Sequence, residues 1–171
     1  MKPGLASIPW SYSEQWQEAN FSLKQIIARA GRGLDGSRDL AVQLSAAYRS
    51  IFPDLDRLCR VTCPRCRDNC CRRAWVWFDF KDLLFLNLAR LPIPPGQLLT
   101  QRGERCRYIT TSGCCLDRLQ RPFVCTWYLC PTQTRRLDRQ SADGKVMIQH
   151  RLADIKHLRR KMESVFIQHT T

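Results

Sequence analysis

The feature that most constrains this chain is its ten cysteines, all of which lie between residues 59 and 130. No stretch of the 171 residues approaches the roughly 18 consecutive apolar residues that a membrane span needs, and the first residues lack the apolar run of a secretory signal. We therefore expect a cytoplasmic protein with no membrane span. Disulfides rarely persist among the reduced thiols of that compartment, so bound metal explains closely spaced cysteines better.

The cysteines form two clusters. The first comprises Cys59, Cys63, Cys66, Cys70 and Cys71, and the second comprises Cys106, Cys114, Cys115, Cys125 and Cys130. Two thiolates separated by two residues can turn back onto one ion, as in zinc knuckles and iron–sulfur sites. Nearby arginines favour the thiolate form and offset its charge. Because such a pair supplies half of a four-ligand site, we expect the second cluster to supply the rest.

The kind of metal centre follows from the donor atoms. Ten thiols exceed the four that a single zinc ion or one [4Fe–4S] cluster takes, and adjacent cysteines such as Cys70 and Cys71 point their side chains apart. One thiol is then spare, or the site is polynuclear or double. A pool rich in cysteine and poor in histidine favours an iron–sulfur cluster, of the [4Fe–4S] type, over zinc. We expect His150, His157 and His169 to be surface residues rather than ligands.

Hydrophobic periodicity organises the first part of the chain. It predicts a helix over residues 11–30, begun by a capping box between Ser11 and Glu14. A second helix is expected over 38–52 and should end at Pro53, because proline cannot donate the helical hydrogen bond. A short third helix follows it.

The middle and the end of the chain read differently. Residues 74–78 are rich in aromatic side chains and predict a short strand. Asp79 should cap a leucine-rich helix after it. Residues 131–168 predict a helical segment, which the Asp143–Gly144 pair is expected to break.

These elements predict a mainly α fold, in which helices pack around an irregular cysteine-rich centre with little β structure. The composition divides the chain into a helical segment at 1–58, a metal-binding core at 59–130 and a basic helical segment at 131–171, which we expect to form one compact domain.

The charge balance bears on partners. The net charge is +13, and arginine dominates over lysine. Such a balance suits a redox partner, an acidic protein or nucleic acid, the last along the basic face of the helix at 145–165. A basic surface that only faces solvent explains the charge equally well. That face carries Arg151, Lys156, Arg159, Arg160 and Lys161.

Other chemistry is thinly represented. The sequence contains no glycine-rich phosphate loop and no Ser/His/Asp arrangement. Asp79 and Asp82 are better explained as helix-start residues than as an acid–base pair. Trp75 and Trp77 are expected to pack beside the metal site rather than to stack on nucleic-acid bases. Enzymatic activity is therefore left open, with no catalytic residue assigned.

Residues 63–130 resemble the YkgJ-like cysteine-cluster family, a zinc- or iron-chelating domain whose cysteine cluster is related to that of flagellin lysine N-methylases. The shared elements are the Cys-x2-Cys pair, the adjacent cysteine pair, a middle cysteine, and the Arg-Pro-x-x-Cys element at 121–125. The chain departs from the family at 117–119, where Asp-Arg-Leu stands for Ile-Tyr-Glu, and in its additional Cys59 and Cys114. The resemblance implies metal ligands at Cys63, Cys66, Cys70, Cys71, Cys106, Cys115, Cys125 and Cys130.

Three functions are compatible with these observations. The first is a metal protein that holds an iron–sulfur cluster or zinc in a redox or structural role. The second is a zinc-stabilised basic module that binds nucleic acid. The third, implied by the resemblance, is an enzyme or accessory protein of lysine methylation.

Overall fold

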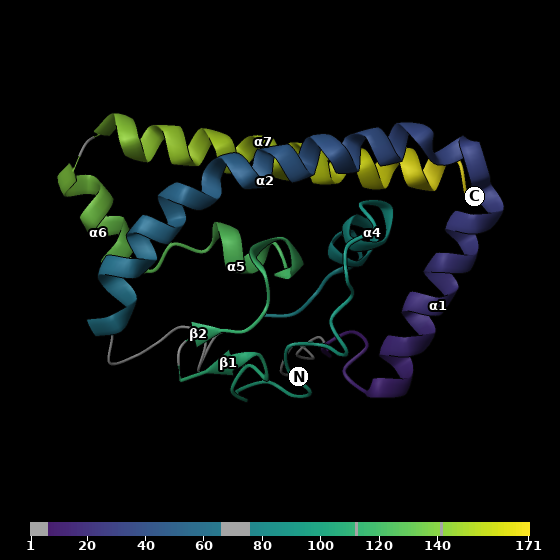
Figure 1. Cartoon of the computed structure of the whole chain (residues 1–171), viewed down its shortest axis with the longest axis horizontal. Coiled ribbons are helices and arrows are strands. Elements are labelled where there is room, and N and C mark those ends of the chain that lie inside the picture. Colours follow the sequence, from purple (N-terminus) through teal and green to yellow (C-terminus); the bar gives the residue numbers. More distant parts are fainter. Residues whose placement is uncertain (1–6, 66–75, 112, 141) are drawn as a thin grey trace, which may run out of the picture.

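The protein is mainly helical, as the sequence predicts, and its two longest helices lie side by side (Figure 1). The computed structural model describes residues 7–65, 76–111, 113–140 and 142–171. Helix α1 (Ser13–Ala30) is joined by a 3₁₀ turn to helix α2 (Asp35–Thr62). Helix α7 (Ala142–Gln168) runs antiparallel to the first part of α2, whose last turns bend away from it (Figure 1).

The remaining elements lie on one side of the α2–α7 pair (Figure 1). They are the 3₁₀ turn Cys63–Arg65, helix α4 (Phe80–Leu88), strands β1 (Ile109–Thr110) and β2 (Gly113–Cys114), the 3₁₀ turn Arg118–Gln120, helix α5 (Val124–Trp127) and helix α6 (Pro131–Gln140). The two strands form an antiparallel hairpin in which Ile109 pairs with Cys114 and Thr110 with Gly113. This sheet matches the expectation of little β structure.

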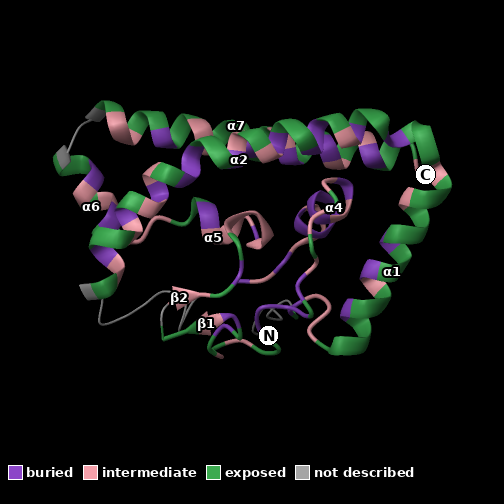
Figure 2. Cartoon of the chain, in the orientation of Figure 1, coloured by how far each residue is buried: buried purple, intermediate pink, exposed green. Residues whose placement is uncertain are grey.

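The core forms between α2 and α7, and α4 packs against both of these helices (Figure 2). The apolar residues that α7 buries are Ile148, Ile155, Met162 and Phe166, and those of α2 include Leu40, Leu44, Ile51, Leu55 and Leu58. Their spacing of three, four and seven residues places them on one stripe of each helix. The helices of segments 1–58 and 131–171 thus share one core.

Helix α4 is buried on nearly every side. It begins with a capping box, in which the Asp79 carboxylate accepts a hydrogen bond from the Asp82 backbone N–H and the Asp82 carboxylate accepts one from that of Asp79, each at 2.9 Å. The prediction that both aspartates are helix-start residues is confirmed, and the cap fixes the end of the helix nearest the cysteines.

Helix α2 corrects the prediction that Pro53 ends a helix, because it continues through Pro53 to Thr62. Pro53 has no N–H to donate to the Arg49 carbonyl one turn earlier. Arg151 of α7 contacts the helix at the neighbouring position, where it donates to the Ser50 carbonyl at 3.1 Å. The same guanidinium binds the Asp54 carboxylate at 3.0 Å, so it bridges the proline from outside the helix. The short third helix predicted after Pro53 is part of α2.

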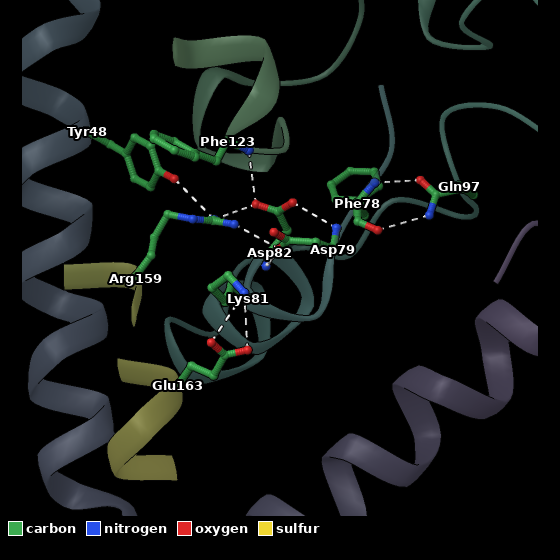
Figure 3. Close-up of polar contacts among 9 residues, drawn as sticks. All are labelled: Tyr48, Phe78, Asp79, Lys81, Asp82, Gln97, Phe123, Arg159 and Glu163. Carbon is green, nitrogen blue, oxygen red and sulfur yellow. Dashed lines mark hydrogen bonds and ion pairs between the residues drawn. The ribbon is translucent and has the colours of Figure 1, made fainter. Parts of the chain in front are cut away.

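The strand predicted at 74–78 is wrong for residues 76–78, which lie in no sheet between described residues, whereas residues 74 and 75 lie outside the described residues. The side chain of Gln97, 1% exposed, occupies the place of a neighbouring strand (Figure 3). Its Oε1 accepts from the Phe78 N–H at 2.7 Å, and its Nε2 donates to the Phe78 carbonyl at 3.1 Å. It also binds the Leu98 N–H and the Pro9 carbonyl, so one amide satisfies four backbone groups.

Replacing Gln97 by leucine is therefore expected to lower the free energy of unfolding by about 3 kcal/mol or more, because each buried backbone group left without a partner costs about 1–3 kcal/mol. Urea unfolding followed by circular dichroism measures the loss. Gln149→Leu, at an exposed position of α7, is the control and should change stability little. Equal losses in the two variants would contradict this role for Gln97.

Two helix boundaries also differ from prediction. Helix α1 begins at Ser13 after Tyr12, without a side-chain cap, so the Ser11–Glu14 capping box is wrong. Its predicted end is confirmed, since Gly31 adopts a φ of 52°, which favours glycine. The expected break at Asp143–Gly144 is wrong as well, because both residues lie inside α7.

No helix within the described residues combines the length and the apolar character that crossing a membrane requires.

Candidate metal centre

Five cysteines line one cavity of about 640 Å³ at the C-terminal end of α2. They are Cys59, Cys63, Cys106, Cys114 and Cys125. They come from three separate parts of the chain, namely the end of α2, the hairpin region and helix α5. Apolar side chains and Arg60, Arg118 and Arg121 form much of the remaining wall. The fold thus brings thiols of the first predicted cluster to the same cavity as thiols of the second.

Cys59 and Cys63 reach the cavity from the end of α2. Residues four apart lie on the same face of a helix, so both side chains point the same way once α2 continues past Pro53. Cys63 is the C-cap residue, and its N–H donates to the Cys59 carbonyl. This ties the two positions together.

The hairpin region contributes Cys106 and Cys114. Cys106 is buried and lies two residues before Tyr108, whose hydroxyl accepts from the Gly96 N–H at 3.1 Å and donates to the Gly96 carbonyl at 2.7 Å. Cys114 ends β2, and successive side chains of a strand point to opposite faces. Cys114 accordingly lines the cavity, whereas Cys115 is exposed.

The Arg-Pro-x-x-Cys element places Cys125. The guanidinium of Arg121 donates to the Leu116 carbonyl at 3.0 Å and to the Cys114 carbonyl at 3.4 Å, which holds the hairpin against this segment. Pro122 is fully buried, and its carbonyl accepts from the Cys125 N–H at 2.9 Å. Arg121 therefore holds the backbone of Cys114 against the segment that carries Cys125.

The thiols influence one another. Burial raises the pKa of the Cys125 thiol well above its usual range, and nearby Cys106 and Cys114 raise it further, against the lowering effect of Arg121. Burial also raises the pKa of Cys106, with smaller raising contributions from Cys114 and Cys115. Without a cation in the cavity, these groups therefore keep their protons at neutral pH.

A buried ion-pair network joins α7, the start of α4 and Phe123, the residue before the helix that carries Cys125 (Figure 3). Arg159 of α7, 2% exposed, donates to the Asp82 carboxylate at 2.5 Å and to that of Asp79 at 2.8 Å. Asp82 also accepts from the Phe123 N–H at 3.0 Å, one residue before α5. The guanidinium lies 4.8 Å from the centre of the Phe123 ring. The network thus fixes the start of the helix that carries Cys125.

Arg159 is consequently a correction to the predicted basic face of the last helix. The sequence predicts an exposed cation at this position, but Arg159 is buried and paired with carboxylates inside the protein. Arg151 is also engaged, in the ion pair with Asp54. Lys156, Arg160 and Lys161 are exposed.

The predicted ligands fall into three groups. Cys63, Cys106 and Cys125 line the cavity. Cys115 is exposed, Cys130 is half-buried, and neither lines it. Cys66, Cys70 and Cys71 lie outside the described residues.

Two cysteines of the cavity, Cys59 and Cys114, are absent from the predicted ligands because they are additions to the family pattern. Their signals were present. The four-residue spacing of Cys59 and Cys63 indicates a shared helix face, and strand alternation separates Cys114 from Cys115. Both signals require knowing that α2 continues and that residue 114 ends a strand.

Other predicted residues can also be placed. His150, His157 and His169 are exposed, which confirms that they are surface residues. Trp77 is half-buried against the core, and Trp75 lies outside the described residues. Cys59, Cys106, Cys114, Cys115, Cys125 and Cys130 are free thiols.

The donor atoms of the cavity fit a thiophilic metal, since sulfur is the ligand that zinc and iron–sulfur clusters prefer and the arginines of the wall would offset thiolate charge. The positions of the described side chains do not themselves complete a site for a single ion. In the part of the chain that the structure describes, no three His, Cys, Asp or Glu side chains lie close enough to hold one ion. Within the described residues, the cavity therefore supplies sulfur donors and cationic side chains but no complete ligand set for one ion.

No family model matches this chain, and neither a curated protein nor a solved structure matches it significantly.

Proposed function

We propose that this chain is a cytoplasmic cysteine-cluster metal protein that holds an iron–sulfur cluster or zinc in a redox or structural role. One observation carries the proposal, namely that five thiols from three separated parts of the chain line one cavity. Thiols distributed by chance would be scattered over the core and the surface. The resemblance to the YkgJ-like family, although no comparison supports it, leads to the same proposal.

An iron–sulfur cluster suits this cavity better than zinc. Thiolates around one zinc ion all touch that ion, whereas the thiolates of a [4Fe–4S] cluster are held apart by the iron and sulfide between them. The described donors that line the cavity include five thiols and no histidine, which favours the cluster. The exposed histidines offer no mixed zinc site nearby.

The residues of the chain have defined tasks in this proposal. Cys63 and Cys125 hold the centre from α2 and α5, and Cys66, Cys70 and Cys71 follow Cys63 in sequence as further ligands. Arg118 and Arg121 offset negative charge at the wall. When bound, a cluster would supply one-electron transfer or a covalent tie across the fold.

Anaerobic purification followed by iron, sulfide and zinc analysis tests the proposal. We expect brown protein with iron and sulfide in similar amounts. Colourless protein with zinc alone would support the second candidate, a zinc-stabilised module that binds nucleic acid through Lys156, Arg160 and Lys161, which take part in no ion pair between described residues. Folded protein that contains neither metal, although never exposed to air or chelator, would overturn the proposal.

The adjacent cysteines 114 and 115 provide a matched pair of variants. Cys114→Ser is expected to lower the metal content, because Cys114 lines the cavity, whereas Cys115→Ser should retain it, because Cys115 is exposed. Metal analysis of both variants is the measurement. The reverse result would assign the ligand to Cys115, as the family resemblance does.

A further inference from the structure

We infer that Cys59 is a ligand of the proposed metal centre and that the side-chain amide of Gln133 tunes its sulfur. The inference rests on the proposed function and goes beyond the family resemblance, which assigns no role to either residue. Two polar side chains point their N–H groups at the sulfur of Cys59, whereas a cysteine that only fills space in a core is surrounded by apolar groups.

The sulfur of Cys59 faces two hydrogen-bond donors. Nε2 of Gln133 lies 3.4 Å from Sγ, and Nη2 of Arg118 lies 4.0 Å from it. Cys59 and Gln133 both line the cavity. Cys59 lies one helical turn before Cys63. A thiol is a weak acceptor, so two polar donors around one sulfur are most favourable when it carries the negative charge of a bound thiolate.

Both donors are held in place by other parts of the fold. Oε1 of Gln133 accepts from the Cys130 N–H at 3.2 Å, which leaves Nε2 as the end that faces Cys59. Gln133 is 7% exposed, so its amide has little freedom to turn away. Arg118 is fixed by the Asp56 carboxylate, 2.7 Å from its Nε. The donors are therefore preorganised around the sulfur.

This arrangement has the form of the outer-shell hydrogen bonds that orient metal ligands. Such bonds hold a ligand in position, and those to the sulfurs of a cluster adjust its electronic properties. Gln133 is thus a positioning residue: it touches the ligand and not the metal. Because its Oε1 also binds the residue that precedes α6, it couples that helix to the proposed centre.

Alkylation with iodoacetamide tests the ligand role in the full chain purified without oxygen. Cys59 should be protected in the metal-loaded protein and become reactive once a chelator removes the metal, whereas exposed Cys115 should react in both states. Peptide mass spectrometry reads each site. Equal reactivity of Cys59 before and after chelation, in protein shown to contain metal, would overturn this inference alone. Wild-type protein that is folded and free of metal would overturn the proposed function as well.

Two variants test the tuning role. Gln133→Glu replaces the donor by an acceptor of the same shape, and Gln133→Met removes hydrogen bonding while keeping the volume. Both should lower the chelator concentration that strips half of the metal, by roughly 10- to 100-fold. Both should shift the sulfur-to-metal charge-transfer absorption to lower energy, read directly for iron or after exchange of zinc for Co²⁺. Gln149→Glu, on the exposed face of α7, is the control.

Circular dichroism separates tuning from misfolding in these variants. If Gln133→Glu fails to fold, Gln133→Met still removes the donor without placing a carboxylate in the core. An unshifted absorption band together with unchanged chelator resistance in a folded Gln133→Met variant would refute the tuning role.

Discussion

Replacing Arg159 by methionine is expected to lower the free energy of unfolding by about 3–5 kcal/mol, the usual cost of removing one partner from a buried ion pair. The variant leaves the carboxylate of Asp82, 6% exposed, without its cation and loosens the hold of that carboxylate on Phe123. Urea unfolding at neutral pH measures the loss. The metal content should fall too, because α5 carries Cys125.

The pH dependence gives this prediction a direction. Burial raises the pKa of Asp82 to about 6 even though Arg159 lowers it, and without Arg159 the pKa rises further. The carboxyl of the variant is then protonated in the folded protein at mildly acidic pH. Since the unpaired charge causes most of the cost, the stability difference from wild type should be smaller at about pH 5 than at about pH 8.

A double variant supplies the control for this network. Arg159→Met combined with Asp82→Asn removes both charges and keeps an acceptor for the Phe123 N–H. It should be more stable than Arg159→Met alone. A double variant that is no more stable than the single one would show that the cost arises from lost packing of the arginine rather than from an uncompensated charge.

Replacing Cys125 by serine is expected to have the second large effect, loss of the proposed metal centre. Metal bonds can contribute on the order of 10 kcal/mol to the stability of small metal-binding domains, so the unfolding temperature should fall with the metal content. Cys125 lines the cavity on a helix that the Arg159 network positions. Metal analysis together with thermal unfolding measures both quantities in one preparation.

Chelation distinguishes the metal from simple packing in this experiment. After a chelator has been applied, wild type and Cys125→Ser should unfold at nearly the same temperature, because the variant has no metal left to lose. Cys63→Ser, at the end of α2, should behave in the same way. A difference that persists after chelation would assign the effect to the packing of the side chain.

Local patterns in the sequence predicted much of the helical framework. The apolar spacing of α7 appears in the structure as a buried stripe, the leucines of α4 are buried, and Asp79 and Gly31 act as the predicted cap residues. These features depend on neighbours within one or two turns, which the sequence presents directly. All ten cysteines lie within residues 59–130, and this clustering likewise indicated the region where the cavity forms.

Tertiary contacts decided the points at which the local rules failed. Proline should end a helix, but α2 continues past Pro53, where Arg151 of α7 binds the Ser50 carbonyl and the Asp54 carboxylate. An aromatic run should pair in a sheet, but Gln97 satisfies the backbone of Phe78 with its side chain. In both cases the hydrogen-bond partner comes from a distant part of the chain, which no window of local sequence contains.

The candidate metal centre, too, depends partly on the sequence and partly on the tertiary structure. Its chemical character, sulfur donors among arginines, belongs to the sequence itself. Which sulfurs share a cavity depends on the direction in which each side chain points, and that direction was set when α2 continued past Pro53 and the hairpin turned Cys114 inward and Cys115 outward. Composition can specify the kind of ligand because it is a property of single residues, whereas convergence is a property of the packed chain.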